Sequence, residues 1–339
     1  MARFMRLEVI NAILDVGVVP LFYNGDAGAA VEVAGALARG GARVIEFTNR
    51  GEMAFSVFTE LVRHFAKAGP DIILGAGSVV DAPTAALYIA SGASFIVGPN
   101  HNPEITRLCN RRKIAYMPGC ATETEIMQAE ELGVEICKIF PGESAGGPGF
   151  ISAVLAPCPW HRLLPTGGVD ATESSISEWI KAGAAAIGMG SKLVTAAAVQ
   201  EKSFDLITSK TAQTIGWIKK ARGIPLFLGI EHAGLHPLKT SAAAIADWYE
   251  KTFGFAKQEG AISYFLSGAG KGRIEVLKKA PGSEPMHVAV QVSNFEDAVS
   301  ALRARGIALK EPIMEPDLKI IYLQEPDPEG NIVHLWWGK

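Results

Sequence analysis

The sequence contains 339 residues, of which 48% are hydrophobic, and its 32 lysine and arginine residues against 35 aspartate and glutamate residues give a formal net charge of −3. This length is sufficient for two domains, or for one large barrel with an addition. A net charge so close to zero provides no electrostatic footprint for nucleic acid or an anionic membrane surface, so neither is expected as a partner.

The first residues, MARFMRLEVINAIL, contain no apolar signal core, because Arg6, Glu8 and Asn11 interrupt them. No segment approaches 18 unbroken apolar residues, so no membrane span is predicted. The four cysteines show neither metal-ligand pairs nor the spacing of a disulfide framework, which favours reduced thiols; they are Cys109, Cys120, Cys137 and Cys158. We therefore expect a soluble, cytoplasmic protein.

Up to about residue 222 the sequence alternates short apolar strands with helical stretches. Eight strands are predicted, at residues 18–22, 43–48, 72–78, 95–99, 115–119, 136–141, 162–168 and 186–191. Helical periodicity between them is clearest at residues 27–39, 53–67, 83–91 and 123–132. Apolar strands that alternate with amphipathic helices indicate a parallel sheet buried on both faces. Eight such units fit a (β/α)8 TIM barrel; an open, doubly wound sheet is the alternative, because counting strands does not show closure.

Lys138 lies inside the apolar run Glu135-Ile-Cys-Lys-Ile-Phe-Pro-Gly142, which reads as a buried strand. Burial disfavours the ammonium form and lowers the pKa of a lysine. A neutral amine is the form that attacks the carbonyl of a keto acid in Schiff-base chemistry. The structural alternative is a lysine that extends from a strand end to solvent or pairs with a carboxylate.

Polar residues gather where the predicted strands end. In a barrel these ends converge on one mouth, where active sites are built, whereas in an open sheet they would spread along an edge. Any one of these Ser or Thr residues could instead be a helix cap. The residues are Glu46, Thr48, Arg50, Ser78, Pro99, Asn100, Thr122, Lys138, Thr166 and Ser191.

Glycine-rich turns follow the last two strands, in Leu164-Pro-Thr-Gly-Gly-Val169 and Ile187-Gly-Met-Gly-Ser191. Backbone amides in such turns can close on a phosphate, with a favourable contribution from the next helix N-terminus. Glu46 is a carboxylate within an apolar strand, so burial should raise its pKa toward an acid/base value. It could otherwise form a salt bridge to Arg50 or Lys138, and Arg50 could instead bind a substrate carboxylate.

After residues 222–223 the pattern changes to a repeat of strand, helix and three strands. His232 in GIEHAGL matches His287 in PMHVAVQV, and the helix 242–253 matches the helix 295–305. The strand 262–266 matches 320–324, and GRIEVL matches NIVHLW, which aligns Glu275 with His334. A pseudo-two-fold arrangement of two such modules would bring these four residues to a central point.

The first 222 residues resemble the class I 2-keto-3-deoxy-6-phosphogluconate (KDPG) and 4-hydroxy-2-oxoglutarate (KHG) aldolases. The resemblance covers nearly all of residues 4–222. It rests on Val44-Ile-Glu-Phe-Thr-Asn-Arg50, Gly75-Ala-Gly-Ser78, Gly98-Pro99, Met117-Pro-Gly119, Lys138-Ile-Phe-Pro141, Pro165-Thr-Gly-Gly168 and Gly190-Ser191. Ser78 stands where the family often has Thr, and Lys192 stands where an apolar residue is usual.

The resemblance implies that Lys138 is the Schiff-base lysine and Glu46 the general acid/base. Arg50 and Ser78 would hold the pyruvyl carboxylate, and the glycine turns with Ser191 would bind phosphate. The full implied substrate-binding set is Arg50, Ser78, Pro99, Thr122, Phe140, Thr166, Gly167, Gly168, Gly190 and Ser191. The resemblance further implies a phosphorylated 2-keto acid substrate, a trimer and no cofactor for the barrel.

Residues 225–339 resemble a vicinal-oxygen-chelate domain of the glyoxalase/bleomycin-resistance superfamily, including its closing turn Asp327-Pro-Glu-Gly-Asn331. The resemblance implies an α+β domain of two βαβββ modules and a divalent metal (Zn, Mn, Fe, Ni or Co). Its ligands would be His232, Glu275, His287 and His334. His334 stands where many members have Glu. A metal-free oligomerisation or ligand-sensing module is the alternative.

The leading functional prediction is a lyase that cleaves KDPG to pyruvate and glyceraldehyde 3-phosphate, or KHG to pyruvate and glyoxylate, or both. A phosphate-binding barrel isomerase or epimerase would use the same glycine turns without needing Lys138. A non-catalytic ligand-binding protein would retain both sites only as pockets.

Overall fold

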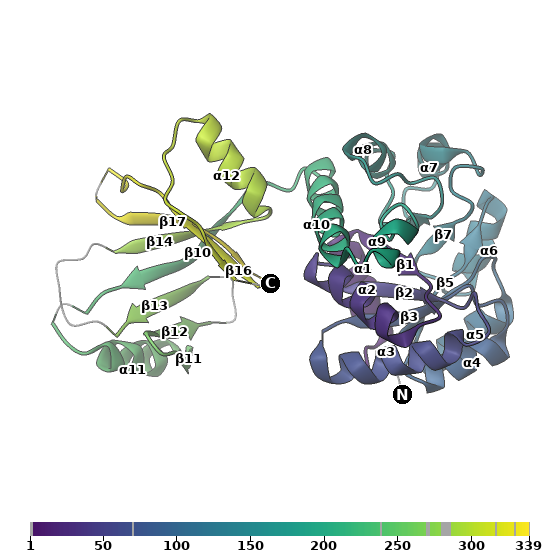
Figure 1. The fold of residues 1–339 in the computed structure, drawn as a ribbon, viewed down its shortest axis with the longest axis horizontal. Helices are drawn as coiled ribbons and strands as arrows, with labels where there is room; N and C mark the ends of the chain where they lie inside the picture. Colours follow the sequence, from purple (N-terminus) through teal and green to yellow (C-terminus); the bar gives the residue numbers. More distant parts are fainter. Residues whose placement is uncertain are drawn as a thin grey trace. The chain divides into compact units, whose positions relative to one another are not determined.

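The computed structural model describes residues 3–69, 71–237, 239–268, 272–278, 286–315, 317–328 and 330–338. Two compact units make up the chain, Met1–Gly223 and Ile224–Lys339 (Figure 1), called unit 1 and unit 2 below. The division falls beside Arg222, where the sequence pattern changes. No helix in the described ranges combines the length and the hydropathy needed to cross a membrane.

Unit 1 alternates strands with helices along its whole length. Its strands are β1 (Val18–Phe22), β2 (Val44–Thr48), β3 (Ile73–Gly77), β4 (Phe95–Val97), β5 (Ala115–Met117), β6 (Gly119–Cys120), β7 (Cys137–Ile139), β8 (Leu163–Pro165) and β9 (Ile187–Met189). Its helices are α1 (Arg6–Val16), α2 (Ala27–Arg39), α3 (Ala54–Ala68), α4 (Ala82–Ala90), α5 (Pro103–Arg112), α6 (Glu123–Glu131), α7 (Gly147–Leu155), α8 (Glu173–Lys181), α9 (Ala196–Gln200) and α10 (Phe204–Ala221).

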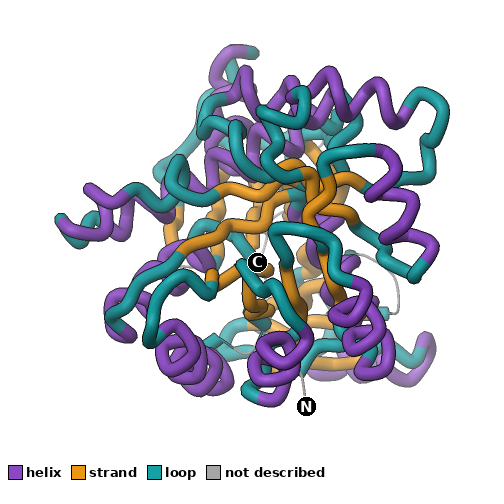
Figure 2. Tube along the Cα trace, turned by 90° about the vertical axis from the view of Figure 1, so that its right-hand side faces the viewer, coloured by secondary structure: helices purple, strands orange, loops and turns teal. Residues whose placement is uncertain are grey.

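The strands of unit 1 pair in parallel and give an α/β barrel-like fold. One sheet has the order β5-β4-β3-β2-β1-β9, and a second has the order β6-β7-β8. β5 and β6 are consecutive segments separated only by Pro118, and a parallel bridge between Thr166 and Gly188 joins the end of β8 to β9. The pairings therefore run in a ring. Helices lie around a centre of strands (Figure 2).

Each predicted strand of this region is found, shortened by one to four residues in most cases. The predicted strand 115–119 is divided at Pro118, because proline has no amide hydrogen to donate to a neighbouring strand. The barrel prediction is supported over the open sheet, since β1, the first strand of unit 1, pairs with β9, its last strand.

Two apolar cores lie on opposite faces of the strands of unit 1. Side chains such as Ile45, Phe47 and Leu74 pack toward the helices in the larger core. Their alternating neighbours Val44 and Ile73 belong to a second core, which also contains residues of α1. Because successive side chains of a strand point to opposite faces, this second core fills the inside of the barrel. Helix α1 contributes Val9, Ile10, Ala12 and Ile13 to it.

The described residues of unit 2 form one sheet and two helices. Its elements are β10 (Phe227–Leu235), α11 (Ala242–Phe253), β11 (Ala256–Glu259), β12 (Ser263–Ser267), β13 (Arg273–Leu277), β14 (His287–Val292), α12 (Phe295–Ala304), β15 (Ile313–Glu315), β16 (Leu318–Tyr322) and β17 (Ile332–Gly338). The strand order is β11-β12-β13-β10-β14-β17-β16-β15. The two halves of this order mirror each other about the antiparallel pair β10–β14.

The predicted repeat is present in unit 2, since each half runs strand, helix and three strands in sequence. Helix α11 has the predicted bounds, and α12 ends one residue earlier than predicted. The turn predicted at 327–331 is closed by hydrogen bonds between Asp327 and both Asn331 and Gly330; residue 329 within it lies outside the described residues.

Candidate active site

The strand alternation places Glu46 and Lys138 on the inner face of the barrel. Glu46 lies two residues after Val44, and Lys138 two residues after Ile136, both members of the inner core. Side chains two residues apart on a strand share a face. The ideal Cβ position of Gly77 on β3 lies 1.7 Å from Glu46 Oε1, so the carboxylate occupies space that any other residue at 77 would fill.

Both ionisable side chains are almost completely buried, with exposures of 3% for Glu46 and 4% for Lys138. Burial raises the pKa of the Glu46 carboxyl, while the charges of Lys138 and Arg50 oppose that shift. Burial also lowers the pKa of Lys138, opposed by the charge of Glu46 and assisted by that of Arg50. The Lys138 Nζ atom lies 4.6 Å from the ring centroid of Phe140. The structure thus brings together a lysine with a depressed pKa, a carboxylic acid with a raised one, and an aromatic wall.

Arg50 and Ser78 lie together at the ends of neighbouring strands. The Arg50 Nε–H donates a hydrogen bond of 3.1 Å to Ser78 Oγ. Arg50 is exposed, which leaves its guanidinium open to a ligand. Ser78 has a φ of +57°, a left-handed conformation that is uncommon outside glycine and that concentrates at functional sites. A cation and a hydroxyl held in this way can bind a carboxylate.

Thr122 caps a helix, whereas Pro99 packs its carbonyl group against Gly119. Thr122 is the N-cap of α6 and forms a capping box with Glu125, whose carboxylate accepts hydrogen bonds from the Thr122 amide and hydroxyl. Its hydroxyl therefore serves the helix, and its contact with substrate stays a prediction. Pro99 follows β4, and its carbonyl oxygen lies 2.1 Å from the ideal Cβ position of Gly119, so only glycine fits there.

The two glycine turns lie side by side. The bridge Thr166–Gly188 and an ion pair of 2.8 Å between Lys192 and Asp170 connect them. Gly167, Gly168 and Ser191 are exposed, and both glycines have positive φ values, of 87° and 86°. The next helices begin a few residues after each turn: α8 begins at Glu173, capped by Thr172, and the five-residue α9 begins at Ala196. The contribution of a helix N-terminus to phosphate binding stays a prediction. Gly190 lies at the start of the second turn.

In unit 2 the strand register brings the four predicted ligands to one place. Gly234 is paired with Glu275 on one side and with His287 on the other. In the next row, Ala289 is paired with both His232 and His334. Glu275 Oε2 lies 3.0 Å from His287 Nε2 and 3.3 Å from His232 Nε2, and the two imidazole nitrogens are 3.1 Å apart. The His334 ring centroid lies 5.4 Å from each of these two rings.

The surroundings of this cluster include a residue that the sequence analysis missed. Glu231 accepts a hydrogen bond from His232 Nδ1 and another of 2.7 Å from Arg273 Nε. A carboxylate on Nδ1 turns the Nε2 lone pair toward the cluster. The only sequence signal was an acidic residue beside a predicted ligand. His334 Nδ1 is buried and has no hydrogen-bond partner among the described residues.

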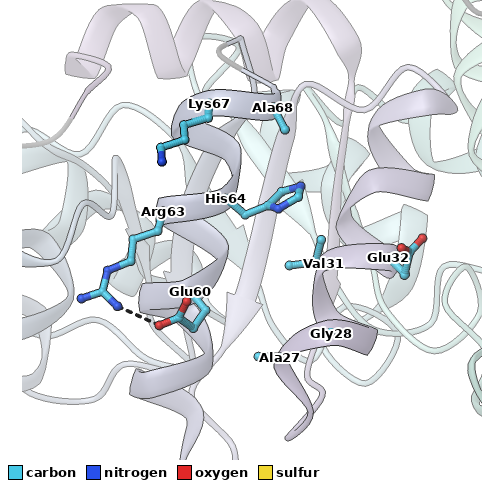
Figure 3. Close-up of a pocket in the computed structure, with 9 residues that line it drawn as sticks. All are labelled: Ala27, Gly28, Val31, Glu32, Glu60, Arg63, His64, Lys67 and Ala68. Carbon is cyan, nitrogen blue, oxygen red and sulfur yellow. Dashed lines mark hydrogen bonds and ion pairs between the residues drawn. The ribbon is translucent and has the colours of Figure 1, made fainter.

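A hollow of about 600 Å³ lies elsewhere, between helices α2 and α3 (Figure 3). It is lined by Gly28, Val31 and His64, with an ion pair of 2.7 Å between Arg63 and Glu60 at its edge. None of the predicted site residues lines it. We therefore place the candidate active site at the strand ends and not in this hollow.

Comparison with known proteins assigns unit 1 to a family. The model of the aldolase family "KDPG and KHG aldolase" matches residues 9–210. The 2-dehydro-3-deoxy-phosphogluconate aldolase of Treponema pallidum is 31% identical over 209 residues, which cover 62% of this chain and 97% of that protein. The KHG/KDPG aldolase of Escherichia coli is 31% identical over 206 residues, covering 60% and 94%.

A solved structure agrees with this assignment. The KDPG aldolase of Legionella pneumophila, with pyruvate captured as a covalent carbinolamine intermediate, is 28% identical with a TM-score of 0.54. It covers 58% of this chain and 93% of its own. The chain belongs to the KDPG and KHG aldolase family and is a class I aldolase, a lyase.

Substitution of Gly77 by alanine should displace the Glu46 carboxylate and lower retro-aldol activity. The added methyl group would lie 1.7 Å from Glu46 Oε1, so the carboxylate would have to move away. A displacement of about 1 Å in a catalytic group can lower the rate about 10²-fold. The measurement is kcat/KM for pyruvate release, with circular dichroism to verify folding. Gly149→Ala is the control, because no atom lies within 4 Å of its ideal Cβ position. Full activity in a folded Gly77→Ala variant would contradict this placement of Glu46.

Proposed function

We propose that unit 1 cleaves KDPG to pyruvate and glyceraldehyde 3-phosphate, and KHG to pyruvate and glyoxylate, with Lys138 as the Schiff-base residue. The observation that supports this most directly is the burial of Lys138, which is 4% exposed and interacts electrostatically with the buried carboxyl group of Glu46. Burial alone would make this pair costly, so its retention is more easily explained by chemistry than by stability. The relatives named for both substrates support the same choice.

In the proposed mechanism the neutral Lys138 amine attacks the C2 ketone to form a carbinolamine. Glu46, acting through a water molecule, protonates the carbinolamine hydroxyl, which leaves as water to give the protonated imine. The protonated imine then accepts the electron pair of the C3–C4 bond, which breaks while Glu46 removes the proton of the C4 hydroxyl. The aldehyde leaves, and the enamine takes a proton at C3. Hydrolysis of the resulting imine releases pyruvate and regenerates the amine.

Substrate binding would be divided between two parts of the barrel mouth. Arg50, with Ser78 beside it, would form a charge-assisted contact with the C1 carboxylate. The glycine turns would accept the phosphate through exposed amides of Gly167 and Gly168 and the Ser191 hydroxyl. Lys192 adds positive charge to the same place, although its ion pair with Asp170 partly neutralises it. The predicted trimer and cytoplasmic location remain predictions.

Reduction with borohydride in the presence of pyruvate should attach a pyruvyl-derived group to Lys138. The adduct is expected by intact mass and by peptide mapping, and it should disappear in Lys138→Arg, because a guanidinium does not form the imine. Lys192→Ala is the matched control: it removes a lysine at the mouth, and pyruvate carries no phosphate to be affected. An adduct on another lysine, or none on the folded wild type, would refute the assignment of Lys138.

The rate of this trapping should depend on pH in a direction set by burial. Only the neutral amine attacks, so the initial rate should rise as pH passes through the lowered pKa of Lys138, with its midpoint below the ordinary lysine value of about 10.4. Arg50→Gln removes a positive charge that contributes to the lowering, so its midpoint should move to higher pH. A midpoint at the ordinary value, or no movement in Arg50→Gln, would contradict the electrostatic account.

We further propose that unit 2 is a vicinal-oxygen-chelate domain that binds a divalent metal ion through His232, Glu275, His287 and His334. The donor atoms of the first three lie 3.0–3.3 Å apart, a spacing suited to ligands of one ion. The buried Nδ1 of His334, which has no hydrogen-bond partner in the described part of the chain, and the Glu231 contact behind His232 also suit a metal centre. Three imidazoles and a carboxylate fit Zn, Mn, Fe, Ni or Co. Such an ion would polarise adjacent oxygens of a keto or hydroxy acid.

Removal of one imidazole should remove metal from unit 2. We expect the purified wild-type chain, reloaded with Ni²⁺ after chelation, to hold one more equivalent of tightly bound metal than His287→Ala. His64→Ala, which removes an exposed histidine of unit 1, should match the wild type. Metal content is measured by elemental analysis after gel filtration. Equal metal content in wild type and His287→Ala would contradict the site and favour the metal-free alternative for this domain.

A further inference from the structure

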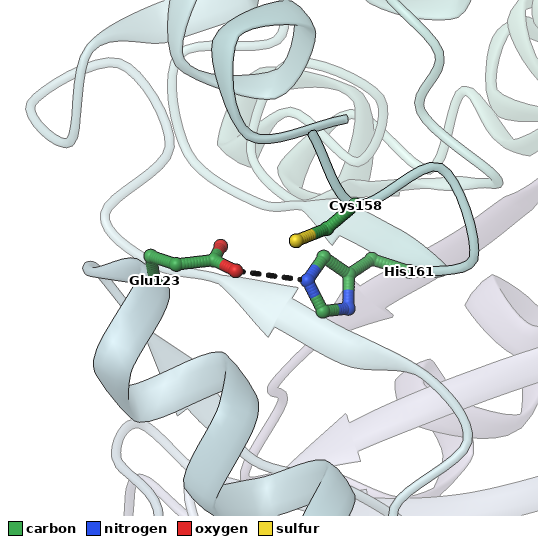
Figure 4. Close-up of side chains that lie close together, drawn as sticks. All are labelled: Glu123, Cys158 and His161. Atoms are coloured by element: carbon green, nitrogen blue, oxygen red, sulfur yellow. Dashed lines mark hydrogen bonds and ion pairs between the residues drawn. The ribbon is translucent and has the colours of Figure 1, made fainter. Parts of the chain in front are cut away.

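A second group of potential ligands lies in unit 1, outside the barrel interior. It consists of Glu123, Cys158 and His161 (Figure 4), called the Glu–Cys–His cluster below. Glu123 is the first residue of α6, and the other two lie in the segment between α7 and β8. The aldolase mechanism uses none of these residues. The sequence analysis overlooked them because it looked for pairs of cysteines, whereas here a cysteine is followed by a histidine three residues later.

The donor atoms of the cluster converge. One carboxylate oxygen of Glu123, Cys158 Sγ and a ring nitrogen of His161 all lie within 4.8 Å of one another. Bonds of about 2.0 Å to nitrogen or oxygen and about 2.3 Å to sulfur place the ligands of a tetrahedral zinc ion roughly 3.2–3.8 Å apart. Small side-chain adjustments would therefore close the cluster around an ion. Figure 4 shows the three side chains directed toward one another from two separate segments of the chain.

The imidazole of His161 is held in the orientation that a ligand needs. Its side chain is completely buried, with an exposure of 0%. Nδ1 forms an interaction of 2.8 Å with Glu130 Oε1, two turns along α6, and Nε2 lies 3.0 Å from Glu123 Oε1. A carboxylate on one ring nitrogen fixes the ring and increases the basicity of the other, as is usual behind metal-bound histidines. Glu130 therefore orients the ring, and Nε2 faces the cluster.

A separate observation indicates a missing partner. Glu123 Oε2 is buried and has no hydrogen-bond partner among the residues that the structure describes. A buried carboxylate oxygen without a donor is costly. A cation among Glu123, Cys158 and His161 would satisfy it. The competing arrangement is a protonated imidazole between the carboxylates of Glu123 and Glu130, with the Cys158 thiol as a hydrogen-bond donor to Glu123. It keeps Cys158 as a thiol, whereas a bound cation would take it as a thiolate.

We propose that the Glu–Cys–His cluster binds a zinc ion, with Glu130 as the residue that positions His161. Thiolate, imidazole and carboxylate together are a donor set that suits zinc. The ion would have three protein ligands and a fourth position for water. It would link the start of α6 to the segment that leads into β8, two neighbouring parts of the barrel wall, and so stabilise unit 1.

Cobalt(II) distinguishes this site from the cluster in unit 2, which contains no sulfur. The chelator-treated full chain, titrated with Co²⁺, should develop a thiolate-to-cobalt charge-transfer band that saturates at one equivalent. The band should persist in His287→Ala and be lost in Cys158→Ser and in His161→Gln. Glu130→Gln should weaken the Co²⁺ affinity by about 10–100-fold, whereas Glu131→Gln, an exposed acid on the same helix, should not change it. Retro-aldol activity and circular dichroism show that each variant is folded.

A second measurement needs no variant. Cys158 is half-buried while the other three cysteines are buried, so it is the residue that an alkylating reagent should reach first. Zn²⁺ should slow alkylation of Cys158 in the wild-type chain at least tenfold, as followed by peptide mass spectrometry. No charge-transfer band in the wild type, a band that remains in Cys158→Ser, or alkylation that Zn²⁺ does not slow would each overturn the proposal.

Discussion

The burial of Lys138 and Glu46 together inside the barrel is the main physical constraint on unit 1. Removing an ammonium or a carboxylate from water costs several kcal/mol per ion, even after the protein relaxes. The attraction between Lys138 and Glu46 opposes this cost, but burial remains the larger influence on the pKa of each. The two pKa values are therefore closer together than those of the same groups in water, since burial raises one and lowers the other. Burial of this pair therefore opposes stability.

The inner face of strand β2 changes from apolar to polar along its length, which places Glu46 next to the apolar core. On β2 the inward positions run from Val44 through Glu46 to Thr48, from the apolar core toward the mouth. Helix α1 contributes apolar side chains to the inner core and so extends the apolar packing on that side. The two buried ionisable side chains thus lie beside an apolar layer, while Arg50 and the glycine turns remain open to solvent. Depth in the barrel separates the buried Lys138 and Glu46 from the exposed Arg50 and glycine turns.

Much of this arrangement could be predicted from the sequence, because it follows from periodicity. The alternation in VIEFT gives the face of Glu46, and the internal repeat places His232 opposite His287. Contacts that depend on side-chain conformation could not be predicted. The Thr122 hydroxyl caps helix α6. Lys192 forms an ion pair with Asp170, and Glu231 forms a hydrogen bond with His232. Each of these contacts depends on loop geometry or on a rotamer, about which residue spacing contains no information.

In both units a glycine on a neighbouring strand makes room for an ionisable side chain. Gly77 on β3 leaves the space into which Glu46 extends from β2. Gly234 on β10 does the same for His287, whose ring would lie 1.9 Å from a Cβ at that position. Since Gly234 is also paired with Glu275, this one glycine allows a carboxylate and an imidazole to meet across a strand. A glycine inside a strand weakens the sheet. In both units that loss leaves room for an ionisable side chain, Glu46 in unit 1 and His287 in unit 2.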